Sequence, residues 1–235
     1  ANTPIVKGST FLFDNIAQWR EARTRRQSER VLSYGARGNE TVYALEDAIT
    51  ALEGGYRSKL FPTGLAAIAA TFLAYLKAGD HVLLSDGAYQ PAKRLCADQL
   101  SRYGIAHSFF DARDADWRRH LRPETRMVYV ESPGSLLYDM CDLPEMSREC
   151  RRRGILLCAD NTLGSSLNYQ PLELGCDVSI LAATKYLGGH SDVMMGSVTT
   201  LEEHFQPLED ISVNLGQVVS AEDAFLVLRG LRTLQ

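Results

Sequence analysis

The sequence lacks the features that would direct it to a membrane or to nucleic acid. None of its apolar runs approaches the roughly 20 residues that a membrane-spanning helix needs. Its first ten residues contain no positively charged segment followed by an apolar stretch, so we expect no secretory signal and no membrane partner. The 25 Lys and Arg residues face 29 Asp and Glu residues, which gives a formal net charge of −4. Without a basic excess we expect no nucleic-acid partner. We also expect the chain to be located in the cytoplasm.

Disulfide and metal-binding patterns are missing as well. The five cysteines are an odd number without CxxC spacing, and Cys158 lies inside an apolar run. This pattern is typical of reduced thiols in a cytosolic protein. The histidines are scattered without ligand spacing, which argues against a metal site. Walker phosphate loops, dinucleotide-binding fingerprints and nucleophile elbows are not found either.

What the sequence does contain is a series of short apolar runs that alternate with helical stretches. Several runs are continuously aliphatic, which is typical of strands covered on both faces. The alternation predicts parallel strands joined by right-handed crossovers, and therefore an α/β fold with a mostly parallel sheet sandwiched by helices. The expected strands are Lys59–Phe61, His81–Ser85, His107–Phe110, Met127–Glu131, Ile155–Ala159, Val178–Ala182 and Ser197–Thr200.

Two of the predicted helices have recognisable ends. The first runs over Val42–Glu53, with Thr41 as its candidate N-cap and Gly54 ending it. The second begins near Gly64, directly after an expected strand, and runs to about Lys77. Because the first turn of a helix has free backbone amides and the positive end of the dipole, the start of this second helix is a candidate anion site.

Lys185 directly follows an apolar strand and precedes Gly188 and Gly189. A lysine at a buried strand end is partly desolvated, which lowers its pKa and favours the neutral amine that forms a Schiff base. The glycines would allow the backbone to pass close to a bound ring. On this segment alone, a lysine that simply ends a strand and reaches solvent is an equally good interpretation.

Two more residues lie at carboxyl ends of expected strands, the edge where ligands bind in open α/β sheets. Asp160 follows a buried strand, and a buried carboxylate needs a cationic partner such as a protonated pyridine nitrogen. The alternative is an aspartate that caps the next turn. Tyr89 follows the strand His81–Ser85 and could stack on a flat ring, although a lone aromatic residue is more often part of the core.

Taken together, the motifs resemble one family. In sequence order they are Tyr34–Asn39, Leu52–Gly55, Glu131–Ser135, Asp160–Thr162, Ala183–Tyr186 and Gly189–Asp192. They are similar to those of the Cys/Met-metabolism transsulfuration enzymes, which depend on pyridoxal 5′-phosphate (PLP). The resemblance implies the large domain of a fold type I PLP-dependent transferase-like protein. The runs Glu131–Ser135 and Gly189–Asp192 favour the branch that cleaves carbon–sulfur bonds of sulfur amino acids by β-elimination. Other reactions on this scaffold, and a PLP-binding relative without activity, remain alternatives.

The resemblance also implies a role for each candidate residue. Lys185 would form the Schiff base with PLP and move protons. Asp160 would pair with the pyridine nitrogen, and Tyr89 would stack on the ring. The phosphate would be held by the amides of Gly64 and Leu65 and by the hydroxyl of Thr184.

The N-terminal part of the chain is expected to serve an interface. Residues 1–55 would form an arm and first helix, because the family builds its sites from dimer pairs, usually within a homotetramer. Tyr34 and Arg37 would reach the neighbouring subunit's cofactor. The family's Tyr-x-Arg motif has Ala36 at its arginine position, and one step along an extended segment, to Arg37, reverses the direction of the side chain. Residues 56–235 would form the PLP-binding catalytic domain, and we expect the C-terminal domain typical of the family to be absent from this chain.

Overall fold

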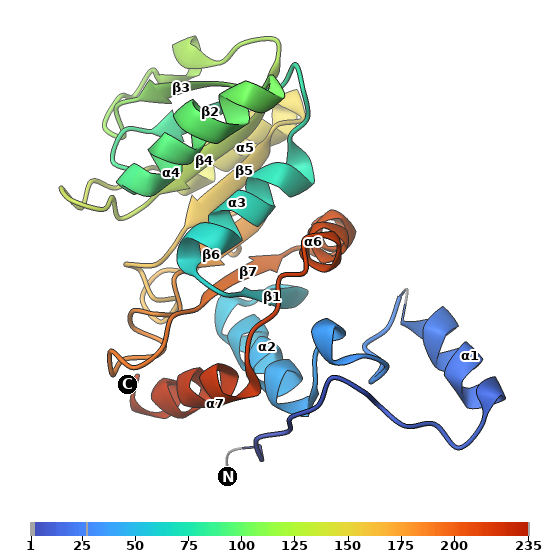
Figure 1. Ribbon diagram of the computed structural model, residues 1–235. Coiled ribbons are helices and arrows are strands. Elements are labelled where there is room, and N and C mark those ends of the chain that lie inside the picture. Colours follow the sequence, from blue (N-terminus) through green and yellow to red (C-terminus); the bar gives the residue numbers. More distant parts are fainter. Residues whose placement is uncertain (1–2, 27, 235) are drawn as a thin grey trace.

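The computed structural model describes residues 3–26 and 28–234. The expected regions 1–55 and 56–235 therefore include a few residues, 1–2, 27 and 235, that lie outside the described part. Within that part of the chain, one seven-stranded sheet has the order β1-β7-β6-β5-β4-β2-β3 (Figure 1). Its strands are β1 (Arg57–Phe61), β2 (His81–Ser85), β3 (Ala106–Phe110), β4 (Thr125–Glu131), β5 (Leu156–Asp160), β6 (Val178–Leu181) and β7 (Gly196–Thr200). Each expected strand is therefore found, with ends that differ by two residues at most.

Helices cover both faces of this sheet. They are α1 (Ile16–Arg25), α2 (Glu40–Glu53), α3 (Gly64–Tyr75), α4 (Gln90–Arg94), α5 (Leu143–Arg153), α6 (Glu202–Asn214) and α7 (Ala221–Gly230). Short turns of 3₁₀ or π helix add η1 (Gly35–Arg37), η2 (Leu95–Gln99), η3 (Leu100–Tyr103), η4 (Trp117–His120) and η5 (Leu231–Thr233). The expected sheet sandwiched by helices is confirmed.

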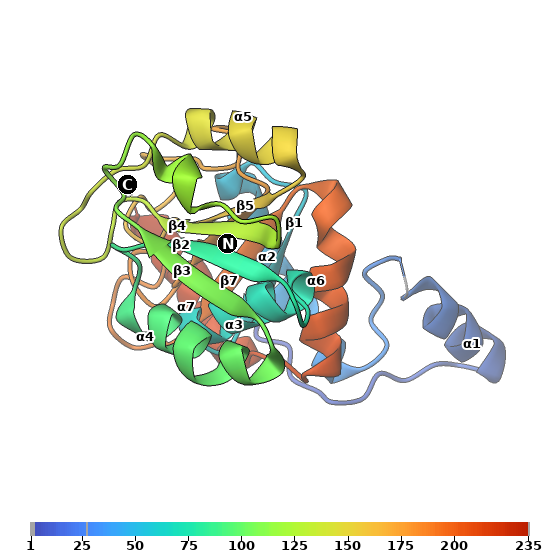
Figure 2. The same cartoon turned by 90° about the horizontal axis from the view of Figure 1, so that it is seen from above.

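The two faces follow from the alternation of side chains along each strand. On β4, Met127 and Tyr129 pack on the side of α3 and α4, whereas Val128 and Val130 pack on the side of α5 (Figure 2). Further along that second face, Leu181 of β6 packs in a cluster with residues of α2 and α7. Because apolar side chains point to both faces of the sheet, several strands appear in the sequence as continuous aliphatic runs.

The strand directions confirm the expected mostly parallel sheet. Strands β2 to β6 pair in parallel, as the alternation of strands and helices predicts. Strand β7 is antiparallel to both β6 and β1, so the sheet is mostly but not entirely parallel, as expected. No helix lies between β6 and β7, and a chain that returns without a crossover helix can only place its next strand antiparallel.

The start of α2 differs from its prediction in a way that affects the N-terminal segment. Asn39, not Thr41, is the N-cap, because its side chain accepts hydrogen bonds from the amides of Thr41 and Val42, each at 3.0 Å. The Thr41 hydroxyl instead donates to the carbonyl of Pro4 at 2.7 Å and accepts from the amide of Val6 at 2.9 Å. Thr41 thus holds the N-terminal segment against α2, while Gly54 ends the helix in a left-handed conformation as expected.

Helix α3 begins as predicted and ends two residues early, at Tyr75. Thr63 caps it by accepting a hydrogen bond from the amide of Ala66 at 3.0 Å. At Gly64 a side chain could not be accommodated, because a Cβ atom there would lie 2.8 Å from that of Ala182. The close approach places the first turn of α3 beside the segment that follows β6, at the carboxyl ends of the parallel strands.

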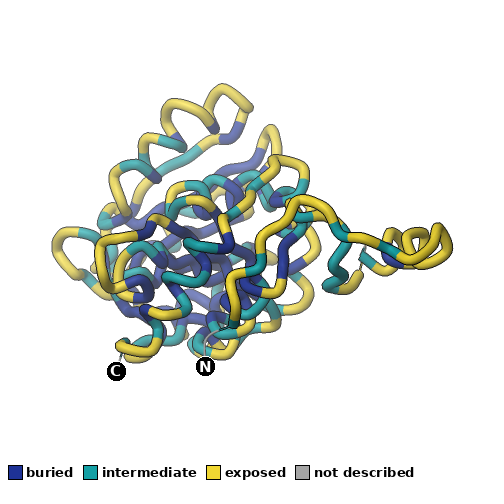
Figure 3. The backbone as a smooth tube through the Cα atoms, turned by 60° about the horizontal axis from the view of Figure 1, so that its bottom comes forward, coloured by how far each residue is buried: buried dark blue, intermediate teal, exposed yellow. Residues whose placement is uncertain are grey.

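The remaining expectations concern thiols, membranes and the N-terminal arm. All five cysteines are buried and unpaired, which confirms the prediction of free thiols. Across residues 3–26 and 28–234 we find no helix with the length and apolar character to cross a membrane. The N-terminal segment that carries α1 is mostly exposed, and Ala22 is the residue of that helix that is buried (Figure 3).

Candidate active site

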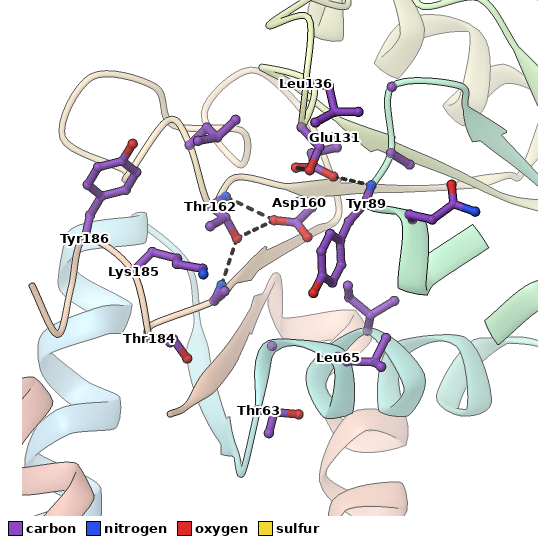
Figure 4. A pocket seen from close by; sticks show the side chains of 18 of the residues that line it. Thr63, Leu65, Tyr89, Glu131, Leu136, Asp160, Thr162, Thr184, Lys185 and Tyr186 are labelled. Carbon is purple, nitrogen blue, oxygen red and sulfur yellow. Dashed lines mark hydrogen bonds between the residues drawn. The ribbon is translucent and has the colours of Figure 1, made fainter. Parts of the chain in front are cut away.

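A cavity of about 1180 Å³ opens where the carboxyl ends of β4 and β5 meet the start of α3. The residues around it come from segments far apart in the sequence (Figure 4). Six of the eight residues predicted from the sequence line it: Gly64, Leu65, Tyr89, Asp160, Thr184 and Lys185. The carboxyl-end rule for parallel strands therefore located the cavity.

Asp160 is a buried acid in the wall of the site, with 5% of its surface exposed. Its Oδ1 atom accepts hydrogen bonds from the amide of Thr162 at 3.0 Å and from the Thr162 hydroxyl at 2.6 Å. Its Oδ2 atom accepts from the Tyr129 hydroxyl at 3.1 Å. Burial raises the pKa of Asp160, and the hydrogen bonds from Thr162 and Tyr129 oppose that rise. The carboxylate is held in one orientation at the cavity wall.

Lys185 lies in the turn that follows β6, with its amide bonded to the carbonyl of Ala182 at 3.0 Å. Its side chain points into the cavity toward Thr162 and Asp160 rather than away from the protein (Figure 4). The residue is nevertheless exposed, so the expected desolvation of this amine is wrong for the chain as it stands. The reason is that Lys185 lies four residues beyond the end of β6, on a turn at the open side of the cavity.

Tyr89 caps the short helix α4 and lies across the cavity from Lys185 (Figure 4). It is 45% exposed, so it is not a core residue, and this removes the alternative that the sequence left open. Its backbone amide donates a hydrogen bond to Oε2 of Glu131 at 2.6 Å. The ring is thus presented to the cavity by a backbone that is fixed at its base.

The candidate phosphate ligands differ in how free they are. The amides of Gly64 and Leu65 belong to the first turn of α3, where no carbonyl of the preceding turn is available to them. The Thr184 hydroxyl already donates to the carbonyl of Met195 at 3.1 Å and accepts from the Met195 amide at 2.9 Å. Its hydrogen would have to rotate before this hydroxyl could donate to a phosphate.

Tyr34 and Arg37 do not line this cavity. Tyr34 is 54% exposed, and Arg37 lines a separate pocket of about 220 Å³ beside Glu46 and Lys59. The segment Gly35–Arg37 is a turn of 3₁₀ helix, so the extended backbone assumed from the sequence is wrong there. A turn packed closely against Gly8 explains the difference, because an added Cβ at Gly35 would overlap the Gly8 carbonyl.

Three further residues complete the site and were not predicted. Glu131 ends β4 and lines the cavity, with its carboxylate accepting from the Tyr89 amide and from the Ser135 hydroxyl at 2.8 Å. Thr162 and Tyr129 hold Asp160. The rule that identified Asp160 at a strand's carboxyl end applies equally to Glu131 and could have found it. The role of Tyr129 depends on packing and carries no local signal.

The donor set fits a flat, phosphorylated pyridine aldehyde. A primary amine and an aromatic ring face each other across the cavity, and a buried carboxylate lies between them (Figure 4). Among the residues that the structure describes, that carboxylate receives only hydroxyl and amide donors, so a ring N–H⁺ would be its first cationic partner there. The free amides at the start of α3 suit a phosphate. The residues present therefore fit PLP.

Comparisons with known proteins agree with this geometry. The sequence profile of the family described as Cys/Met metabolism PLP-dependent enzyme matches residues 1–235. The chain is 45% identical over 235 residues to cystathionine beta-lyase of Bordetella avium, covering 99% of this chain and 59% of that protein. It is 39% identical to cystathionine beta-lyase of Escherichia coli strain K12, covering 99% of this chain and 60% of the relative.

A solved structure of cystathionine gamma-lyase from Lactobacillus plantarum superposes with a TM-score of 0.89 at 30% identity, covering 98% of this chain and 58% of the other. The chain thus spans about three fifths of the length of these proteins. The superposition confirms the expected fold type I architecture. With the family profile matched from end to end, this chain belongs to the PLP-dependent enzymes of Cys/Met metabolism.

Proposed function

We propose that this chain is the cofactor-binding part of a carbon–sulfur β-lyase that cleaves L-cystathionine to homocysteine, pyruvate and ammonia. The observation that carries the proposal is the convergence of Lys185, Asp160 and Tyr89 on one cavity. The β-lyase relatives at 39–45% identity support this reaction over others in the family.

The chain's own residues would supply charge and protons. PLP, when bound, provides an electron sink next to the substrate's α-carbon. Lys185 would hold the cofactor and, after the substrate amine displaces it, accept a proton from the α-carbon at Nζ. The same Nζ would donate that proton to the leaving sulfur. Asp160, oriented by Thr162 and Tyr129, would keep a proton on the pyridine nitrogen.

Assembly and location belong to the same proposal. We propose homodimer pairs, arranged as a homotetramer in the cytoplasm, in which residues 1–55 form the interface and residues 56–235 the catalytic unit. Tyr34, exposed and remote from its own cavity, would then contribute to a partner's site together with Arg37. The substrate would be a small sulfur amino acid, with no nucleic-acid or membrane partner.

A γ-elimination is the second candidate, favoured by the fold similarity to the Lactobacillus plantarum γ-lyase. A product assay with L-cystathionine separates the two reactions. Pyruvate supports β-elimination, and 2-oxobutyrate supports γ-elimination. A coloured, PLP-bound protein that forms neither product would contradict both and support a binding role without catalysis.

A further inference from the structure

The carboxyl group of Glu131 lies where three segments of the site meet. It is 4% exposed, and in the β4–β5 ladder Glu131 is the register partner of Asp160. Alternation along β4 places it on the same face of the sheet as Tyr129, the residue that holds Asp160. Glu131 therefore stands next to the residues proposed to act on the cofactor.

Both oxygens of this carboxyl group accept a hydrogen bond from a different loop. Oε2 accepts from the backbone amide of Tyr89 at 2.6 Å (Figure 4), and Oε1 accepts from the Ser135 hydroxyl at 2.8 Å. The two loops also contact each other, because the Ser135 amide donates to the carbonyl of Gly87 at 2.9 Å. The Glu131 amide donates to the Ser85 hydroxyl at 3.1 Å, which ties the base of the Tyr89 loop to β4.

A buried carboxyl group beside Asp160 is unfavourable unless its acceptors are used. Tyr89 is 45% exposed, so much of its surface has no protein neighbour that would fix the position of the ring. The hydrogen bond from its amide to Glu131 joins these two features. Its position fixes where the Tyr89 backbone stands relative to the end of β5.

We infer that Glu131 is a positioning residue, which holds the Tyr89 loop and the 132–135 loop against the Asp160 strand end so that the tyrosine ring keeps its distance from the aspartate. The inference rests on the proposed function for what the ring contacts. The hydrogen bonds themselves are independent of it. Glu131 acts through Tyr89 and takes no part in proton transfer to substrate.

The chain offers a matched set of variants. Glu131→Gln keeps an acceptor for the Tyr89 amide and can donate to the Ser135 hydroxyl, so it preserves both contacts without the charge. Glu131→Ala removes both contacts, and Ser135→Ala removes one. Tyr89→Ala, alone and combined with Glu131→Ala, gives a double-mutant cycle that tests whether the effect passes through Tyr89.

The first measurement is hydrogen exchange of the Tyr89 amide in the cofactor-free chain. Losing the hydrogen-bond acceptor should speed this exchange by about tenfold in Glu131→Ala. Glu131→Gln should stay close to the parent. Unchanged exchange in Glu131→Ala would overturn the inference whatever the chain does with PLP, so this outcome is distinct from failure of the proposed function.

The second measurement is titration with PLP, followed by the dissociation constant and the induced circular dichroism of the bound cofactor. We expect Glu131→Ala to weaken binding by about tenfold and to reduce the circular dichroism, with Glu131→Gln restoring both. In the Tyr89→Ala background, Glu131→Ala should add little. If Glu131→Gln is as damaged as Glu131→Ala, Glu131 acts through its charge and the positioning role is wrong. The positioning role is also wrong if the double variant shows additive losses, because the effect of Glu131 then does not pass through Tyr89. Should Glu131→Ala fail to fold, Glu131→Gln and Ser135→Ala still separate these outcomes.

Discussion

Glu131 and Asp160 are register partners at the last positions of neighbouring strands, so two buried carboxyl groups share one edge of the cavity. Burial, and then the nearby Asp160 charge, raise the pKa of Glu131 to about 7. A third buried acid, Glu53 at the end of α2, has its pKa raised to about 7 by burial and, more weakly, by the Asp160 charge. Binding of a cofactor with a protonated ring nitrogen should therefore reduce the repulsion among these carboxyl groups.

The raised pKa of Glu53 predicts a pH dependence of stability. The folded state binds an extra proton between the ordinary pKa of 4.5 and about 7, so the free energy of unfolding should fall as the pH rises through that window. Each tenfold change in proton affinity corresponds to about 1.4 kcal/mol, so the total is on the order of 3 kcal/mol. Urea unfolding of the parent and of Glu53→Gln at pH 5 and pH 8 measures it.

Glu53→Gln should flatten that dependence and raise stability at pH 8 relative to the parent. Glu124→Gln, at an exposed position, is the control and should leave the slope unchanged. An unchanged slope in Glu53→Gln would show that this carboxyl group is ionised across the whole window.

Lys185→Ala should abolish the yellow, borohydride-reducible absorbance of PLP-treated protein, because the imine to the chain needs this amine. Where substrate turnover is measurable, it should fall by about 10²–10⁴-fold, the range typical of a lost acid–base group. Lys93→Ala is the matched control, since Lys93 lines the same cavity. A Lys185→Ala protein that remains yellow and reducible, with Lys93→Ala losing the colour, would transfer the assignment to Lys93.

Asp160→Asn should weaken PLP binding by roughly 10–100-fold, because a hydrogen bond to a charged partner contributes about 1.5–3 kcal/mol. Tyr129→Phe removes one of the hydroxyls that hold the carboxylate and should have a smaller effect of the same sign. Equilibrium titration followed by absorbance provides the measurement. Asp139→Asn, a further acid of the cavity wall, is expected to bind like the parent. Equal losses in Asp139→Asn and Asp160→Asn would point to a general field effect.

Thr184→Ala separates a structural hydroxyl from a phosphate ligand. Because the hydroxyl bonds both backbone groups of Met195, its removal should cost about 1 kcal/mol of stability, with Thr184→Ser restoring it. Binding of PLP and of pyridoxal, which lacks the phosphate, gives the second measurement. A phosphate contact predicts that only PLP binds more weakly. Equal weakening of both ligands would leave the hydroxyl a structural role alone.

Local sequence signals predicted the features that depend on one segment at a time. The short apolar runs located the strands that the structure describes, and Gly54 marked the end of α2. The same kind of reasoning assigned the N-cap to Thr41, because it could not see that Pro4 and Val6 compete for that hydroxyl.

The misses at the site have the same origin in distant contacts. The hydrogen bond between Glu131 and Tyr89 joins residues 42 positions apart. The exposure of Lys185 depends on what surrounds a turn. The order of the motifs predicted the family and most of the cavity residues. The contacts between distant segments can be identified only in the three-dimensional structure.

The loop that connects β6 to β7 determines where the Lys185 amine lies. Thr184 and Met195 bond each other across the base of this return, and Leu187 and Val193 anchor it in the cluster beneath. Residues 185–194 thus form a loop whose two ends lie beside the paired strands β6 and β7. The placement of the lysine therefore depends on this loop, so insertions or altered composition at its tip would change the amine's reach and approach angle while leaving the order of the strands intact.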